Sequence, residues 1–179
     1  VCVCAIEGNF DDAQASVKRI FTDPALKEAL AAHGLLFSSA NSINWGRLLP
    51  QIVYYVYAYL ELARTGRLSL GDPMDVVVPT GNFGNILAAY YARKMGIPIR
   101  KLVCASNRNK VLTDFIRTGT YDRRREFYST ASPSMDILVS SNLERLLYDL
   151  AGEDSVQLAG WMKELAESGC YSVGDAVRE

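Results

Sequence analysis

Residues 77–85 read Val77-Val78-Pro79-Thr80-Gly81-Asn82-Phe83-Gly84-Asn85, and they carry the strongest structural signal in the chain. A short apolar run typical of a buried strand enters a turn with two glycines, and an amphipathic segment that predicts a helix follows at once. The N–H groups at the start of a helix are unpaired and lie at the positive end of the helix dipole. Gly81 and Gly84 would let such a backbone approach an anion closely. The segment is therefore a candidate phosphate-binding turn that needs no lysine or arginine.

The same residues also fit a tight glycine turn with an asparagine cap and no ligand, and spacing alone does not separate the two interpretations. A dinucleotide loop of the form G-x-G-x-x-G fits less well, because it would need glycines where Phe83 and Ile86 stand. The next strand also ends in Ser106 and Asn107 rather than in an acidic residue that would hold a ribose. The pattern G-x-x-x-x-G-K-[ST] is absent, which argues against a nucleotide triphosphate.

Apolar runs and helical periodicities alternate on both sides of this turn. The sequence predicts strands at residues 1–6, 35–37, 74–79 and 99–105. It predicts helices over about residues 10–21, 24–32, 44–64, 85–95, 110–117, 143–150 and 155–168. This alternation indicates an α/β fold, a doubly wound parallel sheet with flanking helices. Ligands of such sheets bind beyond the carboxyl ends of the strands, which is where the glycine turn lies.

Two further segments are distinctive. The predicted helix 44–64 is apolar on nearly every face, so we expect it to be largely buried. The chain then loses periodicity between residues 119 and 140, and loops this long inside a compact domain are uncommon and often functional. We treat residues 1–179 as one fragment, with 119–140 as a long functional loop and no complete second domain.

A second polar helix entrance is formed by Ser39-Ala40-Asn41-Ser42-Ile43-Asn44-Trp45-Gly46-Arg47. Hydroxyl and amide groups precede the helix here, and an arginine follows about one turn later. This constellation can grip a phosphate through charge-assisted hydrogen bonds to Arg47. Plain capping with a surface arginine explains it as well, and on these residues alone capping is the stronger interpretation.

Composition excludes several classes of function. The chain has 179 residues, 49% hydrophobic and 22% charged, with a net charge of −1, so it offers no footprint for nucleic acid or an anionic membrane. The basic run 123–125 precedes Glu126 and fits a solvated loop. The longest apolar run, 52–60, is too short to span a bilayer. The four cysteines form no C-x-x-C pair, and the single histidine, His33, has no cysteine near it in the sequence, which argues against a zinc site. Free thiols of this kind suit a reducing cytoplasm. Cys2 and Cys4 alternate along the first predicted strand, so we expect both to be buried.

The ordered set of motifs resembles threonine synthase of the longer bacterial and fungal type, within the fold-type II enzymes that use pyridoxal phosphate (PLP). The resemblance covers essentially the whole chain, and each motif is specific only as part of the set. It implies that residues 1–179 are a single fragment of the PLP-binding (catalytic) region. It is carried by residues 8–14, 39–55, 79–85 and 132–137.

The resemblance implies roles for individual residues. The loop that holds the PLP phosphate in this family matches Gly81, Asn82, Phe83, Gly84 and Asn85. The region that receives the phosphate of the substrate O-phosphohomoserine matches Asn41, Ser42, Asn44 and Arg47. By this likeness the parent enzyme would release phosphate from the substrate and add water to give threonine, with PLP as the electron sink. Two phosphates must then be held, which agrees with two separate polar helix entrances.

The family's catalytic lysine, which holds PLP as a Schiff base, lies upstream of anything in this chain. None of the lysines here has its context, and both ends of the chain look cut from a longer polypeptide. We therefore expect the fragment alone to be inactive, with the remaining segments of its own full-length chain as partners. Two alternatives stay open. One is a related phospho-lyase that gives 2-oxobutyrate, and the other is a non-catalytic phosphate-binding module.

Overall fold

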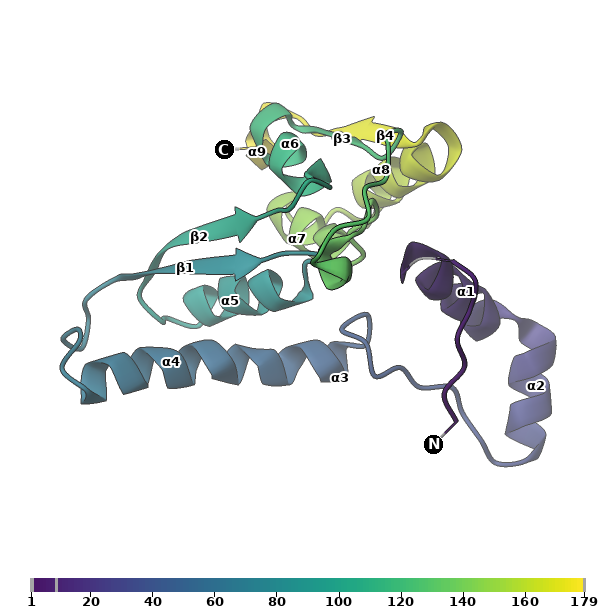
Figure 1. Ribbon diagram of the computed structural model, residues 1–179, viewed down its shortest axis with the longest axis horizontal. Helices are drawn as coiled ribbons and strands as arrows, with labels where there is room; N and C mark the ends of the chain where they lie inside the picture. Colours follow the sequence, from purple (N-terminus) through teal and green to yellow (C-terminus); the bar gives the residue numbers. More distant parts are fainter. Residues whose placement is uncertain (1, 9, 179) are drawn as a thin grey trace. The chain divides into compact units, whose positions relative to one another are not determined.

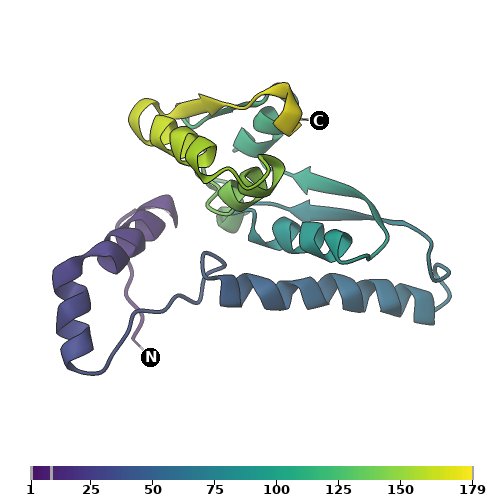
Figure 2. The same ribbon diagram turned by 180° about the vertical axis from the view of Figure 1, so that it is seen from behind.

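The computed structural model describes residues 2–8 and 10–178 (Figures 1 and 2). The chain divides into two compact units, Val1–Ala40 and Asn41–Glu179. The first unit consists of two helices, α1 (Phe10–Thr22) and α2 (Pro24–Ala32). Asp23 caps α2, because its side chain accepts hydrogen bonds from the N–H groups of Ala25 and Leu26.

The prediction of strands at 1–6 and 35–37 is wrong for residues 2–6 and 35–37, which are the part of those segments that the structure describes. These segments have no strand assignment, and Cys2 and Cys4 are exposed rather than buried. An alternating apolar segment becomes a strand only when another strand pairs with its N–H and C=O groups. No such pairing involves either segment in the described part of the chain.

The second unit is built on a parallel pair of strands, β1 (Met74–Pro79) and β2 (Ile99–Ala105), joined by helix α5 (Gly84–Lys94). Figures 1 and 2 show α5 between this sheet and the long helix α4 (Ile52–Arg64). The α5 side chains that fill the resulting layer are buried, among them Ile86, Leu87 and Ala89. The predicted α/β class with a parallel sheet is therefore confirmed.

The predicted helix 44–64 is divided into α3 (Trp45–Leu48), a 3₁₀ turn η1 (Leu49–Gln51) and α4. The division falls at Pro50, which lacks the N–H that a continuous helix needs. The expectation of general burial is wrong. Ile52, Tyr55 and Tyr59 are buried, and the first two belong to the same core cluster as the α5 side chains. The other face is open to solvent, since four of its side chains are more than half exposed: Val53, Tyr54, Tyr57 and Leu60.

The chain after β2 forms a smaller antiparallel layer. Its elements are α6 (Val111–Thr118), β3 (Thr120–Asp122), η2 (Pro133–Met135), α7 (Leu143–Leu150), α8 (Ser155–Ser168), β4 (Cys170–Ser172) and α9 (Asp175–Arg178). Strands β3 and β4 pair in antiparallel register. Tyr121 and Tyr171 lie opposite each other in that register and stack with their ring centroids 5.4 Å apart. This stack anchors the layer to the core.

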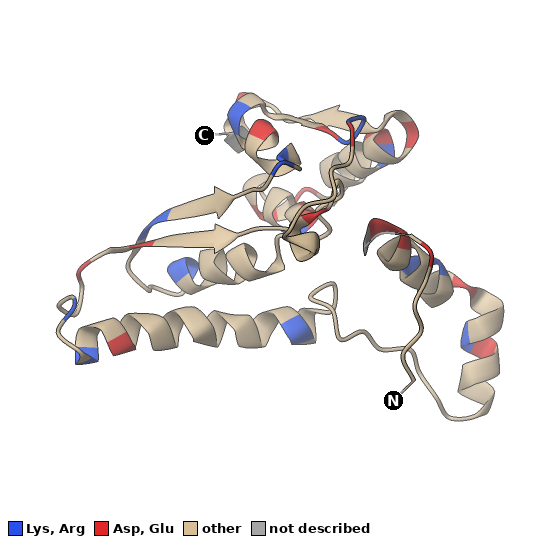
Figure 3. Cartoon of the chain, viewed as in Figure 1, with Lys and Arg blue, Asp and Glu red and all other residues tan. Residues whose placement is uncertain are grey.

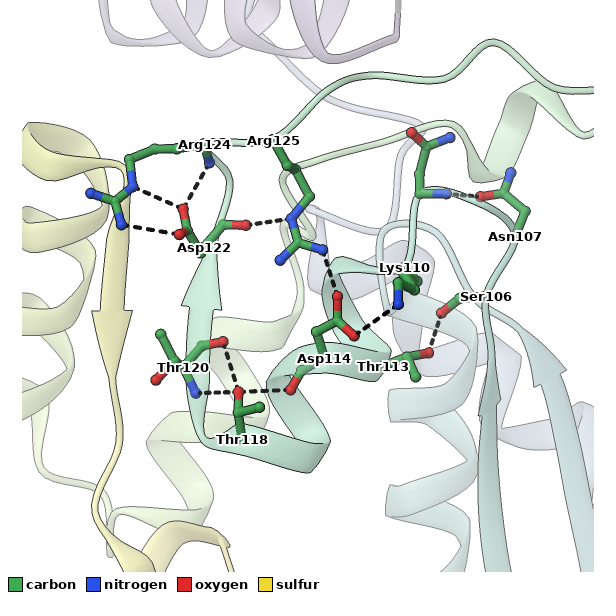
Figure 4. A network of polar contacts seen from close by, with 11 residues as sticks. Ser106, Asn107, Lys110, Thr113, Asp114, Thr118, Thr120, Asp122, Arg124 and Arg125 are labelled. Carbon is green, nitrogen blue, oxygen red and sulfur yellow. Dashed lines mark hydrogen bonds and ion pairs between the residues drawn. The ribbon is translucent and has the colours of Figure 1, made fainter.

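Charged residues are distributed along the elements of the second unit, as the colours of Figure 3 show. Two arginines of the basic run 123–125 pair with nearby carboxylates (Figure 4): Arg124 pairs with Asp122, and Arg125 donates to the Asp114 carboxylate at 2.7 Å. The Arg125 guanidinium lowers the pKa of that carboxyl. Within residues 2–8 and 10–178, no helix is long and apolar enough to cross a membrane, and no cluster of His, Cys, Asp or Glu is placed to hold a metal ion.

Candidate functional site

The glycine turn lies at the carboxyl end of β1, beside the carboxyl end of β2. The N–H of Thr80 still bonds to the carbonyl of Ala105 at 2.9 Å, so the strand pairing continues up to the turn. Phe83 then takes the left-handed conformation, with φ 68° and ψ −3°, and α5 begins at Gly84. The chain thus reverses from strand to helix within residues 80–83.

The main-chain amides of this turn provide donors for an anion. The N–H of Gly84 bonds to the side-chain oxygen of Asn82 at 3.1 Å, and that of Leu87 bonds to the Phe83 carbonyl. The described part of the chain offers no acceptor to the N–H groups of Gly81, Asn82, Phe83, Asn85 and Ile86. These unpaired donors lie at the positive end of the α5 dipole, where a negatively charged group is stabilised.

The two glycines are required by neighbouring parts of the protein. A Cβ on Gly81 would lie 2.7 Å from the carbonyl oxygen of Ser134 in η2. A Cβ on Gly84 would lie 2.3 Å from the Ser42 hydroxyl oxygen. Real side chains do not make such contacts, so glycine is needed at both positions whether or not a ligand binds. The turn is thereby packed between η2 and the segment that contains Ser42.

The side chains of Phe83 and Asn85 are engaged inside the protein. Phe83 is 6% exposed and lines an apolar cavity of about 160 Å³ with Phe115 and Leu147. The Asn85 side-chain oxygen accepts from the Tyr55 hydroxyl at 2.6 Å, and its nitrogen donates to Gln51 at 3.1 Å. Burial raises the pKa of Tyr55 to about 12, so this hydroxyl stays a donor. Phe83 and Asn85 can therefore offer a ligand their main-chain N–H groups only.

The second polar segment is placed next to the turn. Asn44 caps α3, because its side chain accepts from the Gly46 N–H at 2.9 Å, and Arg47 on α3 is exposed. The side-chain oxygen of Asn44 therefore acts as a helix cap, as the simpler of the two interpretations predicts. Ser42, by contrast, is 9% exposed and lies against Gly84.

The two predicted segments form one continuous site. The side-chain nitrogen of Asn82 donates to the Ser42 hydroxyl oxygen at 3.2 Å and to the Asn41 side-chain oxygen at 3.4 Å. The sequence suggested two separate helix entrances, and the structure makes them adjoin. A separation of about 40 residues along the chain hides this contact from the sequence alone.

Three residues that the sequence analysis did not select complete the site. The Ser140 hydroxyl donates to the Gly81 carbonyl at 2.8 Å. Asn142 is 0% exposed, and its N–H and side chain both bond to the Asn82 carbonyl. Arg145 donates to the carbonyls of Ser42 and Ile43. The sequence has the polar run Ser140-Ser141-Asn142 just before a helix. Such a run usually indicates a helix N-cap, so it did not point to a role in the site.

The predicted long loop is ordered by one buried carboxylate. Asp136 accepts hydrogen bonds from the Thr130 N–H and hydroxyl and from the side chains of Asn107 and Asn109. Burial would raise the pKa of this carboxyl, but the donors outweigh it and the net pKa lies below the ordinary value. Asp136 directly follows η2, so this network positions the Ser134 carbonyl beside Gly81.

The site as a whole presents donors rather than acceptors to a ligand. Unpaired amides, the Ser42 hydroxyl and a helix N-terminus suit a phosphoryl group without any metal or lysine. Three lysines of this unit are engaged elsewhere: Lys94 with Asp149, Lys110 with Asp114 and Lys163 with Glu167. The arrangement defines the chain as an α/β protein with a group of hydrogen-bond donors at the carboxyl end of its parallel strands, which is where ligands of such sheets bind.

Comparisons with known proteins agree with this class and narrow it. The chain is 53% identical over 176 residues to human threonine synthase-like 1, which covers 97% of this chain and 24% of that protein. It is 42% identical over 184 residues to threonine synthase of Saccharomyces cerevisiae, covering 98% of this chain and 34% of that protein. No family model matches the chain.

Solved structures give the same result. The crystal structure of PLP-bound threonine synthase from Brucella melitensis matches with a TM-score of 0.80 and 42% identity, over 96% of this chain and 35% of that one. Yeast threonine synthase matches with a TM-score of 0.76. The chain spans between about a fifth and two fifths of the length of the proteins it matches. It is therefore homologous to a segment of the threonine synthase family, as its motifs suggested.

Proposed function

We propose that this chain supplies the phosphate-binding part of a PLP-dependent threonine synthase. The parent enzyme converts O-phosphohomoserine and water to threonine and phosphate, in the cytoplasm, where the four free cysteines suit the reducing conditions. The observation that carries the proposal is the run of unpaired amides at the start of α5, packed against the buried Ser42.

The donor set fits the phosphate of PLP. The N–H groups of Gly81, Asn82, Phe83 and Asn85 would hold its oxygens, while the Asn82 and Asn85 side chains hold the turn in place. PLP, when bound, supplies an electron sink for carbanions of the substrate. We assign Asn41, Ser42, Asn44 and Arg47 to the phosphate of O-phosphohomoserine. Arg47 is exposed at the second helix entrance, where a charged donor suits a substrate that must enter and leave.

Product analysis of the full natural gene product tests this function. We expect O-phosphohomoserine to yield threonine and phosphate in equal amounts, and only when PLP is present. The 179-residue chain by itself should bind PLP weakly and show no turnover, since none of its lysines has the context of the family's catalytic lysine. Threonine formation without PLP, or no reaction with PLP, would contradict the proposal.

A second candidate is a phospho-lyase that converts the same substrate to 2-oxobutyrate, ammonia and phosphate. The relatives named threonine synthase-like 1 are 53–60% identical to this chain, whereas those named threonine synthase are 41–44% identical. Both reactions begin with loss of phosphate and would use the same phosphate sites. Release of 2-oxobutyrate in place of threonine would select this candidate. A non-catalytic phosphate-binding module would release neither product.

A further inference from the structure

Arg145, in the first turn of α7, binds neutral oxygens rather than a carboxylate. Its guanidinium donates to the Ser42 carbonyl at 2.8 Å and to the Ile43 carbonyl, about 100 residues away along the chain. No Asp or Glu in the described part of the chain pairs with it, whereas four other arginines each form an ion pair. The contacts of Arg145 therefore orient a piece of backbone and do not neutralise a charge.

The contacted backbone is the turn that carries the second polar segment. Asn41 accepts from the Ile43 N–H through its side-chain oxygen at 3.1 Å and from the Asn44 N–H through its carbonyl at 3.0 Å. The two peptide groups that link residues 42–44 are thus bound at both ends, with their N–H groups held by Asn41 and their carbonyls by Arg145. Because a peptide group is planar, this fixes the directions in which the side chains of residues 42–44 extend.

The position of the guanidinium is itself restrained from two sides. It also donates to the Asn142 side-chain oxygen, and it lies over the Trp45 ring, 5.9 Å from the ring centroid. The N–H of Asn142 bonds to the Asn82 carbonyl at 3.0 Å, so the start of α7 contacts the glycine turn as well. One helix end therefore holds both polar segments, the turn through Asn142 and residues 42–44 through Arg145.

Arginine has the geometry that this task needs. Its guanidinium is a planar fork of N–H donors, and its two terminal nitrogens bind the two carbonyls, one each. Lysine has all its donors on one nitrogen, and methionine has none. Arginine also keeps its charge at any working pH, so the orientation does not depend on pH.

We propose that Arg145 is a positioning residue that sets the orientation of residues 42–44 for the phosphate of O-phosphohomoserine. It acts through the backbone rather than by contact with the substrate. This inference rests on the proposed function, which assigns that segment to the substrate's phosphate. Binding of the cofactor's phosphate should depend on Arg145 less, because the glycine turn is also held by Ser140.

Two probes of the full natural gene product test the two phosphate sites separately. One is the phosphonate in which a methylene group replaces the ester oxygen of O-phosphohomoserine, so that no phosphate can leave. Its Kd is measured on the enzyme loaded with PLP. The other is pyridoxine 5′-phosphate, which has the cofactor's phosphate but no aldehyde, added to the enzyme without PLP. We expect Arg145→Met to raise the Kd of the phosphonate about tenfold or more, since misplaced donors lose hydrogen bonds to a charged group, and that of pyridoxine 5′-phosphate by less than about threefold.

Steady-state kinetics provide a second readout. The KM for O-phosphohomoserine should rise about tenfold in Arg145→Met while kcat changes by less than about threefold, because the lost binding is shared by the ground state and the transition state. Arg145→Lys should have a KM close to that of Arg145→Met, since it keeps the charge but not the fork. Free guanidinium added to Arg145→Ala should lower the KM towards the wild-type value, whereas ethylammonium at the same concentration should not.

Three results would overturn this role. A wild-type KM in Arg145→Lys would mean that the charge matters and the fork does not. An equal rise of both Kd values, or a lower Tm with unchanged KM, would make Arg145 a purely structural residue. If the wild-type protein binds neither probe, the proposed function fails, and the role of Arg145 fails with it.

The matched control is Arg93→Met, which removes an exposed arginine from the last turn of α5 and should change neither Kd. Thermal unfolding shows whether each variant is folded. If Arg145→Met does not fold, Arg145→Lys decides the question. A KM raised about tenfold would then support the positioning role, and a wild-type KM would overturn it.

Discussion

Phe83 holds a backbone conformation that side chains rarely adopt, and it does so between two glycines. Its φ of 68° costs about 1 kcal/mol or more for a residue with a Cβ. The buried ring offsets that cost, because it packs in the same apolar core cluster as Phe115 and Leu147. The strand-to-helix reversal is therefore held by an aromatic anchor as well as by glycine.

Substitutions at Phe83 should reverse the usual order of alanine and glycine. Phe83→Ala should lower the free energy of unfolding by about 3–5 kcal/mol. Phe83→Gly should cost less than alanine by about 1 kcal/mol, because glycine adopts positive φ freely. Urea denaturation measures both. Phe115, buried within α6, is the control, and there glycine should be worse than alanine. If alanine were more stable than glycine at both positions, the positive φ of Phe83 would not be what determines the order.

Asp136 should make the loop around η2 sensitive to pH. Its pKa lies below that of an unfolded aspartate, about 3.9, so its stabilising effect is present above that pH. The effect is lost as pH falls through the lower, folded pKa. Asp136→Asn should lower the Tm at pH 7, and the difference from wild type should shrink as pH falls below about 3.9. A constant difference across that range would mean that the charge is unimportant.

At the scale of elements, α4 and α5 are joined at their polar ends as well as by apolar packing. The Tyr55 hydroxyl and the Gln51 side chain hold Asn85 in the first turn of α5. Ser140, which follows η2, holds the Gly81 carbonyl from the other side. Each side of the turn is thus tied to a different element.

Removing the Tyr55 hydroxyl should weaken this connection without opening a cavity. We expect Tyr55→Phe to lower the free energy of unfolding by about 1–2 kcal/mol, because the Asn85 side-chain oxygen loses a buried donor. Tyr57 on the same helix is 67% exposed, and Tyr57→Phe should change stability by less than about 0.5 kcal/mol. Thermal and urea unfolding of both variants provide the measurement. Equal losses of stability would show that the hydrogen bond from Tyr55 to Asn85 does not stabilise the connection between α4 and α5.

The elements that the sequence predicts well are those whose signals are local. The parallel strands β1 and β2 and helix α8 lie where apolar runs and helix caps indicate. Strands β3 and β4 have three residues each, too few for a pattern to register, and exist because they pair with each other. The strands predicted at 2–6 and 35–37 do not form for the converse reason. No strand in the described part of the chain pairs with either segment.

The site follows the same rule. The turn at Gly81–Asn85 is visible in the sequence because glycines between a strand and a helix are a local signal. Asn142 and Arg145 could not be selected, because what matters about them is a contact about 100 residues away with Ser42 and its neighbour. Likewise, the sequence cannot say that Gly84 makes room for Ser42 rather than for a ligand.

At the scale of the whole molecule, a phosphate site is only part of what a PLP enzyme needs, since the cofactor must also be joined to a lysine. Lys94, Lys110 and Lys163 form ion pairs, and Lys101 is exposed on β2. Binding of the cofactor's phosphate by the amides of the turn and attachment of its aldehyde to a lysine thus depend on different groups. They can be measured separately.

We expect the 179-residue chain incubated with PLP and reduced with borohydride to carry no stoichiometric pyridoxyl group on any lysine. Scattered labelling of exposed lysines at low yield is the expected background. The intact mass and peptide mapping of the reduced chain measure the yield at each position. The full natural gene product, treated in parallel, should acquire one pyridoxyl group per chain if it carries the anchoring lysine. Stoichiometric labelling of a single lysine within residues 1–179 would show that this chain joins the cofactor by itself, and the assignment of its role to phosphate binding alone would have to be abandoned.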